Sequence, residues 1–497
     1  MWRENMTLPS FPALNESIKA DIGIVGGGIT GITAAYLLAK QNFNVVLLDA
    51  GPVLNGTTGH TTAKITAQHG LIYDELINHF GLEKASLYYK AAEEAKQFIE
   101  QTVNEHRINC NFSKEDAYIY TNDGSYISDL EKEKEAYDQL KIDNQLTDKI
   151  PLDIPIKSAL IMHNQAQFHP LEYLKVLLNE GLKKQLTVYE NTIATDIEYV
   201  KHTNIITREG HRVTCRYVIV ASHFPFYDRQ SFYFARMYPE RSYLVAGKSP
   251  LNFPGGMYIN AETPTRSIRS AKFEGEDIIL IGGEHHKTGQ GKSTMAHYEA
   301  LQKFAQDHFK IDKIDYRWSA QDLTTLDKVP YIGRMTKGDK TVLTATGFRK
   351  WGMTSGTIAA KILADNIQDQ ENPYSDLFSP ARFEADPGLK KFMEINADVA
   401  KHLIKGKLEF TKNTVSELAT DDATVTRMDG KRVGVYKDEE DTLHMVDTTC
   451  THMGCEVTWN SGDRTWDCPC HGSRFDYTGE VVEGPAKKPL TKIVENN

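Results

Sequence analysis

Two short Cys-His motifs near the end of the chain offer the most specific chemistry in this sequence. Cys450 and His452 form the first motif, and Cys468 and His471 form the second after fifteen intervening residues. A [2Fe-2S] cluster with two cysteines on one iron and two histidines on the other needs two thiolates and two neutral imidazoles. Zinc is the competing interpretation, but zinc fingers usually pair Cys with Cys and His with His on separate elements. Because each motif here supplies one Cys and one His, the pattern favours the iron–sulfur cluster and electron transfer.

The residues around these motifs extend the pattern over about the last ninety residues. The segments concerned are 450–455 (Cys-Thr-His-Met-Gly-Cys), 468–476 (Cys-Pro-Cys-His-Gly-Ser-Arg-Phe-Asp), Gly484-Pro485-Ala486 and Pro489-Leu490. Together they resemble the Rieske subunits of cytochrome bc and b6f complexes. The resemblance implies that the four Cys and His residues named above bind the cluster. It also implies a disulfide between Cys455 and Cys470, and a hydrogen bond from Ser473 toward a cluster sulfur.

One position departs from that pattern. Phe475 stands where those subunits usually carry a tyrosine. Because hydrogen bonds to the sulfurs of a cluster raise its reduction potential, the missing phenol predicts a weaker oxidant than the respiratory clusters.

Length and composition limit the class of protein. The chain has 497 residues, of which 40% are hydrophobic and 25% charged, and its formal net charge is −10. These values are typical of a globular protein of about two or three domains. The negative charge and the lack of a basic run argue against nucleic acid and anionic membranes as partners. We expect no transmembrane segment, no secretory signal in residues 1–20 and a cytoplasmic location.

The remaining cysteines are isolated in the sequence. Cys110 and Cys215 have no Cys or His partner nearby and are expected to be buried structural thiols. A disulfide in a reducing compartment needs protection, which burial beside a cluster would provide.

A glycine-rich turn near the start of the chain predicts a dinucleotide site. An apolar run at residues 21–25 is typical of a buried strand, and a helical pattern follows it to residue 40. Between them stand three glycines spaced as G-x-G-x-x-G, namely Gly26, Gly28 and Gly31. A second strand is predicted at residues 44–48, with Asp49 placed to bind a ribose hydroxyl. Such a turn brings the backbone close to a pyrophosphate at the helix N-terminus; a tight turn without a ligand is the alternative.

Other segments indicate which dinucleotide binds. A pyridine-nucleotide disulfide reductase would carry a second glycine-rich module and usually a redox Cys pair, and neither occurs. Residues 217–221 instead resemble the strand that returns to the adenosine half of FAD. Residues 188–197 resemble the strand whose backbone contacts adenine, which places Ile193 at that contact.

A second glycine-punctuated turn, at residues 346–354, precedes an apolar helix at residues 358–367. With the strands just described, it resembles the D-amino-acid oxidase and glycine oxidase superfamily across about residues 18–370. In that family the last helix points its N-terminus at the flavin, where it stabilises negative charge on the reduced ring. The resemblance implies cofactor contacts from Gly347, Gly352, Met353 and Thr354.

The same family places a loop under the flavin, which corresponds here to residues 56–64. Its small residues and hydroxyls, including Thr57 and Thr58, suit close packing against phosphate and ring. His60 falls where the dimethylglycine dehydrogenase relatives carry a histidine joined covalently to the flavin, although Gly59 replaces a bulky residue of theirs. A covalent bond, a non-covalent contact and a structural role therefore remain open for His60.

Together the resemblances predict the fold class and the domain order. We expect an α/β FAD-binding (Rossmann-like) domain with an interleaved α+β substrate domain, then a C-terminal all-β Rieske domain. The expected ranges are 1–80, 150–235 and 325–375 for the FAD-binding domain, 80–150 and 236–324 for the substrate domain, 376–406 for a helical connector, and 407–497 for the Rieske domain. Within them, residues 82–130 are expected to be mainly helical, and strands are expected at 432–436 and 444–447.

Substrate residues are the least specific prediction. Oxidation of a C–H bond next to an amine needs orientation and charge complementarity more than a dedicated base. Cationic and aromatic candidates in the expected substrate domain are Arg266, Arg269, His285, His286 and Trp318. Each competes with an ordinary structural role, and a carboxylate-binding arginine cannot be assigned.

Two functions fit these features. In the first, an FAD-dependent oxidoreductase acts on the CH–N bond of a small amine or amino-acid-like molecule. Its [2Fe-2S] cluster then exports electrons to an acceptor protein or a quinone-like acceptor. In the second, the chain is a non-catalytic electron-transfer or redox-sensing protein. A Rieske oxygenase is disfavoured, because no D-x-x-H-x-x-x-x-H run supplies a mononuclear iron site.

Overall fold

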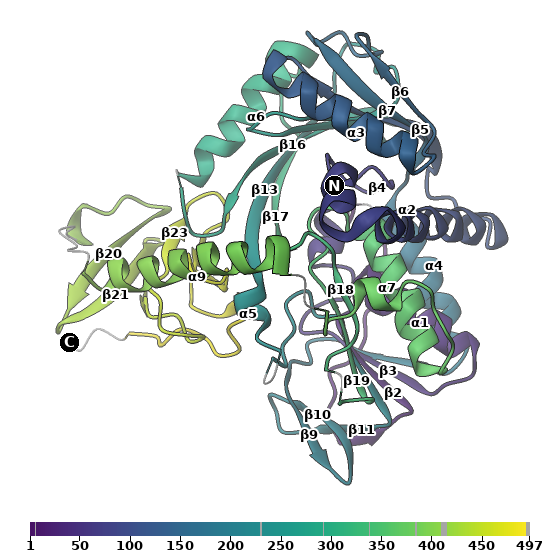
Figure 1. Cartoon of the computed structure of the whole chain (residues 1–497). Coiled ribbons are helices and arrows are strands. Elements are labelled where there is room, and N and C mark those ends of the chain that lie inside the picture. Colours follow the sequence, from purple (N-terminus) through teal and green to yellow (C-terminus); the bar gives the residue numbers. More distant parts are fainter. Residues whose placement is uncertain are drawn as a thin grey trace.

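The computed structural model describes residues 1–4, 6–228, 231–291, 293–336, 338–382, 385–408 and 415–493. Residues 409–414 and 494–497, which fall in the range expected for the Rieske domain, lie outside them. Three regions follow one another around the molecule: a six-stranded sheet with its helices, a nine-stranded sheet, and the C-terminal domain (Figure 1).

The six-stranded sheet carries the glycine-rich turn. Its order is β18-β19-β12-β2-β3-β8, and all neighbours run parallel except β18 and β19. The strands are β2 (Ile22–Val25), β3 (Val45–Leu48), β8 (Leu186–Tyr189), β12 (Tyr217–Val220), β18 (Tyr331–Arg334) and β19 (Val342–Thr346). The helices α1 (Ile29–Lys40), α4 (Pro170–Leu182) and α7 (Gly352–Ile367) pack beside it. The inner strands are buried on both faces, which explains their uninterrupted apolar runs.

A small sheet extends this region. Its order is β1-β11-β10-β9, from β1 (Ile18–Lys19), β9 (Ala194–Val200), β10 (His202–Thr207) and β11 (Arg212–Cys215). The predicted strand at 188–197 is therefore interrupted, because β8 ends at Tyr189 and β9 begins at Ala194. Ile193 lies in the turn between them.

The nine-stranded sheet has the order β17-β13-β16-β15-β14-β5-β7-β4, with β6 also paired to β7. Its strands are β4 (Lys64–Ile65), β5 (Ser113–Thr121), β6 (Asn144–Thr147), β7 (Ser158–Gln167), β13 (Met237–Gly247), β14 (Met257–Asn260), β15 (Arg266–Phe273), β16 (Glu276–Lys287) and β17 (Tyr316–Thr325). The helices α3 (Ile127–Gln139) and α6 (Thr294–Phe309) pack on this sheet, and α2 (Tyr73–Glu105) contacts both α3 and α7. Thus β4 and β7 come from ranges expected for the FAD-binding domain.

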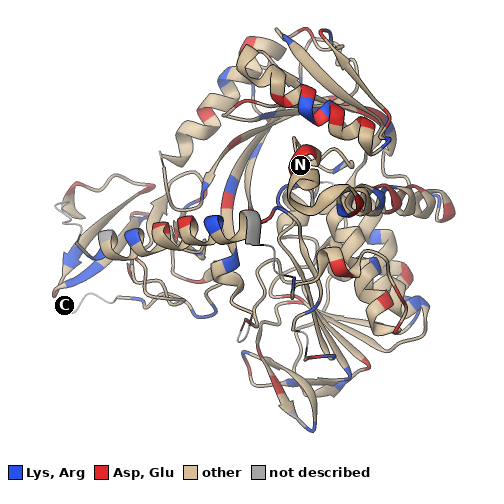
Figure 2. Ribbon diagram, viewed as in Figure 1, with Lys and Arg blue, Asp and Glu red and all other residues tan. Residues whose placement is uncertain are grey.

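The helical expectation for residues 82–130 is wrong in its second half. Helix α2 ends at Glu105, and β5 lies between β14 and β7 in the sheet. The last five residues of β5, Ala-Tyr-Ile-Tyr-Thr, are all buried and rich in the aromatic and β-branched side chains that favour strands. Charged residues alternate in sign along the exposed face of α3 at the top of Figure 2.

The connector and the C-terminal domain follow. Helices α8 (Ser375–Phe378) and α9 (Ala385–Leu408) lead to two antiparallel sheets, β20-β21-β22 and β23-β24-β25-β26. The strands are β20 (Asp422–Met428), β21 (Lys431–Lys437), β22 (Leu443–Asp447), β23 (Thr458–Asn460), β24 (Thr465–Asp467), β25 (Arg474–Asp476) and β26 (Val481–Glu483). Within the described ranges, no helix combines the length and apolar character needed to cross a bilayer.

Candidate functional site

The glycine-rich turn joins β2 to α1. Gly26 has a φ of 114°, and a Cβ there would lie 2.3 Å from the carbonyl oxygen of Ala221. A Cβ on Gly31 would lie 1.8 Å from the carbonyl oxygen of Gly26. These two glycines therefore allow α1 and β12 to approach the turn closely. The N–H of Ile29 donates to Thr58 Oγ1 at 3.1 Å, so the loop after β3 is tied to the start of α1.

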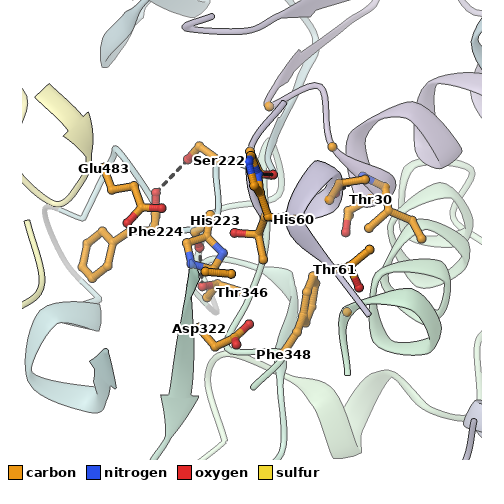
Figure 3. Close-up of a pocket in the computed structure, with 18 of the residues that line it drawn as sticks. Thr30, His60, Thr61, Ser222, His223, Phe224, Asp322, Thr346, Phe348 and Glu483 are labelled. Carbon is orange, nitrogen blue, oxygen red and sulfur yellow. Dashed lines mark hydrogen bonds between the residues drawn. The ribbon is translucent and has the colours of Figure 1, made fainter. Parts of the chain in front are cut away.

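A cavity of about 440 Å³ opens beside this turn. Its walls come from the six-stranded sheet and its loops, from the nine-stranded sheet, and from residues 481–487 of the C-terminal domain. Figure 3 shows Glu483 and Phe224 on one side of the cavity and His60 and Thr30 on the other, with Asp322 between them. The cavity is therefore enclosed by all three regions of the chain.

Two helix N-termini border the cavity. Helix α1 begins at Ile29 and α7 begins at Gly352; both residues line the cavity, and neither helix has a side-chain hydrogen bond from its N-cap residue. Free N–H groups and the helix dipole at such ends favour anionic groups. A Cβ on Gly352 would meet no atom within 4 Å, so open space lies against this turn. The residues present thus fit a dinucleotide with a pyrophosphate and a flavin ring.

Asp49 holds the glycine-rich turn in place. Its Oδ2 accepts a hydrogen bond from the N–H of Gly27 at 2.6 Å, and its Oδ1 accepts one from the N–H of Gly51 at 2.9 Å. Burial raises the pKa of Asp49, although both hydrogen bonds act to lower it. The carboxylate also lines the cavity, where a ribose hydroxyl could reach it.

Most of the predicted cofactor residues lie at the cavity. Those that line it are Gly26, Gly28, Asp49, Thr57, Thr58, His60, Ile193, Gly347, Gly352 and Met353. Gly31 and Thr354 lie behind the wall instead; Thr354 Oγ1 donates to the carbonyl oxygen of Thr66 at 3.1 Å. His60 Nδ1 lies 3.0 Å from the carbonyl oxygen of Gly56, so one ring nitrogen is engaged within the loop. These assignments stay predictions of cofactor contacts.

The four predicted cluster ligands come together in the C-terminal domain. The rings of His452 and His471 lie 5.0 Å apart at 89°, and the Nδ1 atom of each is buried without a hydrogen-bond partner among the described residues. Burial lowers the pKa of His452 to about 4 and that of His471 to about 3, so both imidazoles are neutral. Hydrogen bonds from Cys468, the backbone and Ser473 lower the pKa of Cys450 to about 7 despite burial. Two orphaned imidazole nitrogens beside two buried thiols fit a [2Fe-2S] cluster.

The other two cysteines of this region form a disulfide. Cys455 and Cys470 are bonded, with the two Sγ atoms 2.02 Å apart, as the resemblance implied. The Sγ atoms of Cys455, Cys468 and Cys470 lie within 4.8 Å of one another. This trio is not a metal site, because two of its sulfurs are already bonded together. Cys110 and Cys215 are free and buried, as expected.

The cluster loops pack directly on the nine-stranded sheet. A Cβ on Gly472 would lie 2.5 Å from the Cβ of Pro239 on β13, so only glycine fits at this contact. Gln321 Nε2 donates to the carbonyl oxygen of Gly472 at 3.0 Å. The ring of Phe234 lies 5.7 Å from that of His452 and 5.5 Å from that of His471. The predicted ligands are therefore covered by a residue from outside their own domain.

A buried ionic network fixes this contact. Arg241 Nε of β13 donates to Asp463 Oδ2 at 3.0 Å, and Arg474 Nη2 lies 3.0 Å from the same oxygen. Arg474 Nη1 also pairs with Glu483 Oε2 at 3.3 Å. Burial would raise the pKa of Asp463, but the two arginines outweigh it and lower the pKa to about 2. The network thus joins the C-terminal domain to the sheet and ends at Glu483 on the cavity wall.

The predicted substrate residues lie outside the cavity wall. Arg266 pairs with Glu284 at 2.5 Å, and Arg269 Nη1 donates to the carbonyl oxygens of Thr62 and Ala63 at 2.9 Å. Both arginines are therefore engaged in contacts that hold the fold. Their role in substrate binding stays a prediction.

The three remaining candidates also lie behind the wall. Trp318 Nε1 donates to the carbonyl oxygen of His60 at 2.9 Å, so it anchors the flavin loop. His286 Nε2 lies 3.0 Å from the Tyr243 hydroxyl. His285 differs, because its Nδ1 is buried without a partner among the described residues and burial lowers its pKa.

Several charged residues at the cavity were not singled out from the sequence. They are Lys64, His223, Asp322, Arg349, Lys350 and Glu483. Lys64 Nζ donates to Ser267 Oγ at 2.7 Å, and burial, with Arg269 adding, lowers its pKa to about 7. The Nε2 atom of His223 is buried without a partner among the described residues. Lys64 lies in the predicted flavin loop, and Asp322 follows Trp318 closely. Their positions in or beside recognised segments could have indicated from the sequence that they lie at the site.

Comparisons with known proteins agree with this geometry. Residues 21–366 match the FAD dependent oxidoreductase (DAO) family, and residues 410–494 match the Rieske [2Fe-2S] domain. The protein YhfW of Bacillus subtilis (strain 168), described as a Rieske 2Fe-2S iron-sulfur protein, is 50% identical over 492 residues, which cover 99% of this chain and 97% of that protein.

The FAD dependent oxidoreductase region and the Rieske domain also have separate relatives. Gamma-glutamylputrescine oxidoreductase of Escherichia coli (strain K12) is 25% identical over 72% of this chain and 86% of its own length. The cytochrome b6-f complex iron-sulfur subunit 1 of a Nostoc species is 48% identical over 56 residues, or 11% of this chain and 31% of that subunit. The crystal structure of glycine oxidase from Geobacillus kaustophilus aligns with a TM-score of 0.62 and 17% identity, over 73% of this chain and 99% of that one. The predicted fold class and both predicted cofactors are thereby confirmed.

Proposed function

The chain belongs to the family of FAD-dependent oxidoreductases and ends in a Rieske [2Fe-2S] domain, and from this premise we propose its reaction. It oxidises a small amine or amino-acid-like molecule at the C–H bond beside nitrogen, and the electrons leave through the cluster to an external acceptor. FAD supplies hydride acceptance, and the cluster supplies one-electron transfer. The acceptor is a protein or a quinone-like molecule.

One observation carries the proposed coupling. Residues 481–487, which belong to the C-terminal domain, line the same cavity as the glycine-rich turn. Within that segment, the N–H of Ala486 donates to Ser473 Oγ at 3.0 Å, and Ser473 in turn contacts the Cys450 thiol. A short covalent and hydrogen-bonded path therefore joins the cavity wall to the predicted cluster ligands. Such proximity supports electron transfer within one chain.

The amine substrate is supported by the relatives and by the wall of the cavity. The Escherichia coli relative is named for gamma-glutamylputrescine, which is an amine. In this chain, Ser242, Leu244 and Ser267 of the nine-stranded sheet also line the cavity, so its wall includes hydroxyl-bearing and apolar side chains. These side chains can orient a small molecule and exclude water around the reacting carbon.

The test is anaerobic mixing of the holoprotein with a panel of primary amines, N-methylated amines and amino acids. Flavin bleaching and the electron paramagnetic resonance signal of the reduced cluster are followed together. We expect at least one compound to bleach the flavin and then to produce the cluster signal. If none does, while a reduced carrier protein reduces the flavin, the chain is an electron-transfer or sensing protein instead.

A further inference from the structure

Two carboxylates lie side by side on neighbouring strands, and one of them, Asp322, lines the cavity. Glu240 on β13 is directly opposite Asp322 on β17 in the register of the two antiparallel strands. Residues opposite each other in such a pair point to the same face of the sheet, and like charges there are destabilising. The fold thus keeps an unfavourable pair of which one member, Asp322, lines the cavity beside the glycine-rich turn, and such pairs are common at functional sites.

Asp322 has no partner for its charge. Its carboxylate makes no hydrogen bond or ion pair with any residue in the described ranges, and it lines the cavity. Figure 3 shows it in the central space between His223 and Phe348. Glu240 differs, because it accepts a hydrogen bond from Thr324 Oγ1 at 3.2 Å. Asp322 is therefore the member of the pair that is available to a ligand.

No ion pair joins Lys350 to Asp322 among the described residues. A closed ion pair would favour the charged forms of both groups. Burial instead raises the pKa of Asp322 to about 7 and lowers the pKa of Lys350. Besides burial, Lys350 and Arg241 lower the pKa of Asp322, whereas Glu240 and Glu483 raise it. Glu240 and Arg241 come from β13, Lys350 from the loop before α7, and Glu483 from β26. His223 and Arg349 also line this cavity.

We propose that Asp322 binds the ammonium group of the substrate and removes its proton, which makes the substrate class a cationic primary or secondary amine. This inference rests on the proposed oxidation at FAD. One N–H bond of the ammonium breaks and one O–H bond forms on Asp322, and no electron is transferred in this step. The neutral amine then has the lone pair that stabilises the neighbouring carbon as hydride leaves for FAD. A base whose pKa lies near the working pH suits this role.

The experiment uses the holoprotein with the substitution Asp322→Asn. Butylamine, N-methylbutylamine, 1,4-diaminobutane and glycine serve as probes, together with any amine that bleaches the wild-type flavin. Binding is measured as perturbation of the oxidised flavin spectrum, and bleaching is measured from pH 5.5 to 8.5, a range chosen to bracket a pKa of about 7. Glu276→Gln is the matched control, because Glu276 is an exposed carboxylate on the same sheet.

We expect amine binding to weaken at least about tenfold and bleaching to slow at least about a hundredfold in Asp322→Asn, with no change in Glu276→Gln. In wild-type protein, bleaching should rise with pH through about 7, and Asp322→Asn should lose this rise. Glu240→Gln should move the midpoint to lower pH, because Glu240 raises the pKa of Asp322. A purely structural role would not move the midpoint.

The outcomes separate this inference from the function on which it rests. If amines bleach Asp322→Asn as fast as wild type, Asp322 is not the base, although amine oxidation stands. If no amine bleaches wild-type flavin, both proposals fail. If Asp322→Asn does not retain FAD, the same measurements are made on Asp322→Glu and Glu240→Gln. Unchanged pH midpoints of flavin bleaching in both variants would overturn the assignment of Asp322 as the base.

Discussion

The two cofactor sites are built in opposite ways. The predicted cluster ligands lie between residues 450 and 471, on two loops of one small domain, and a disulfide joins those loops. The flavin cavity is walled by segments that range from Val25 to Lys487 and belong to all three regions. The difference teaches that a local site can be disabled alone, whereas the distributed site depends on how the regions pack. Variants that disable one site and spare the other test this contrast.

Replacing one cluster ligand should abolish the cluster and spare the flavin. In Cys468→Ala, a four-ligand site loses a thiolate that nothing else nearby can replace, since Cys455 and Cys470 are bonded to each other. We expect labile sulfide and the cluster signal to disappear while FAD content stays at wild-type level. Cys215→Ala, which removes a buried free thiol elsewhere, is the control. Loss of both cofactors in Cys468→Ala would contradict a locally built site.

A side chain added at the glycine-rich turn should weaken FAD binding and spare the cluster. In Gly26→Ala, the new Cβ would meet the carbonyl oxygen of Ala221 at a residue with positive φ. We expect FAD affinity to fall roughly tenfold to a hundredfold, because strain of about 1–3 kcal/mol accompanies such positions. Gly338→Ala, where a Cβ meets nothing within 4 Å, should change little. Titration of the apoprotein with FAD measures both, and a lost cluster signal in Gly26→Ala would argue against separate sites.

Breaking the ionic network should loosen the contact between the regions. Arg241→Gln leaves Asp463 buried with one arginine instead of two. Removing one partner of a buried pair costs about 3–5 kcal/mol, so we expect a fall in the free energy of unfolding of this order in urea. Lys248→Gln removes an exposed pair with Glu276 and should leave the free energy of unfolding nearly unchanged. Equal effects in the two variants would mean that the network does not hold the domains together.

The same network predicts a dependence on pH. The folded pKa of Asp463 is about 2, below its ordinary value of about 3.9. Its contribution to stability is therefore complete above about pH 4 and is lost as pH falls through the folded pKa. In Arg241→Gln that pKa should rise toward the ordinary value, so the loss of stability below about pH 4 should be smaller and should be complete at a higher pH than in the wild type. Unfolding curves of both proteins between pH 2 and pH 5 provide the check.

The smallest effect concerns the potential of the cluster. Phe475 is fully buried in the C-terminal core, opposite Trp466 on β24. Phe475→Tyr offers a hydroxyl to the cluster region and should raise the reduction potential modestly. Tyr477→Phe removes a hydroxyl two residues along the chain and is the control. If redox titration finds no rise in the reduction potential of Phe475→Tyr, the missing phenol does not lower the potential of this cluster.

The sequence predicted best what is local. The glycine-rich turn, the cluster motifs and the disulfide all depend on residues close together in the chain or on a recognised pattern. Residues 113–121 fall in the range that was expected to be mainly helical, yet the pairing of β5 with β7 and β14 makes them a strand. Long-range strand pairing overrides such local patterns.

The charged residues of the cavity could not be predicted in the same way. Asp322 faces Glu240 only because β13 and β17 pair in one register. Glu483 reaches the cavity only because the C-terminal domain packs on the sheet through Arg241. Neither relation is visible in sequence spacing. The predicted candidates Arg266 and Arg269 were chosen by residue type and by their place in the expected substrate domain, and their charges are engaged in contacts with other parts of the fold.

The central claim is that electrons pass from FAD to the cluster within one chain. Flash photoreduction of FAD in the anaerobic holoprotein, followed by the rate at which the cluster signal appears, tests it directly. We predict a rate that does not change when the protein concentration is varied tenfold, and that is lost in Cys468→Ala. A rate that rises in proportion to protein concentration, or a cluster that stays oxidised while FAD is reduced, would contradict the account.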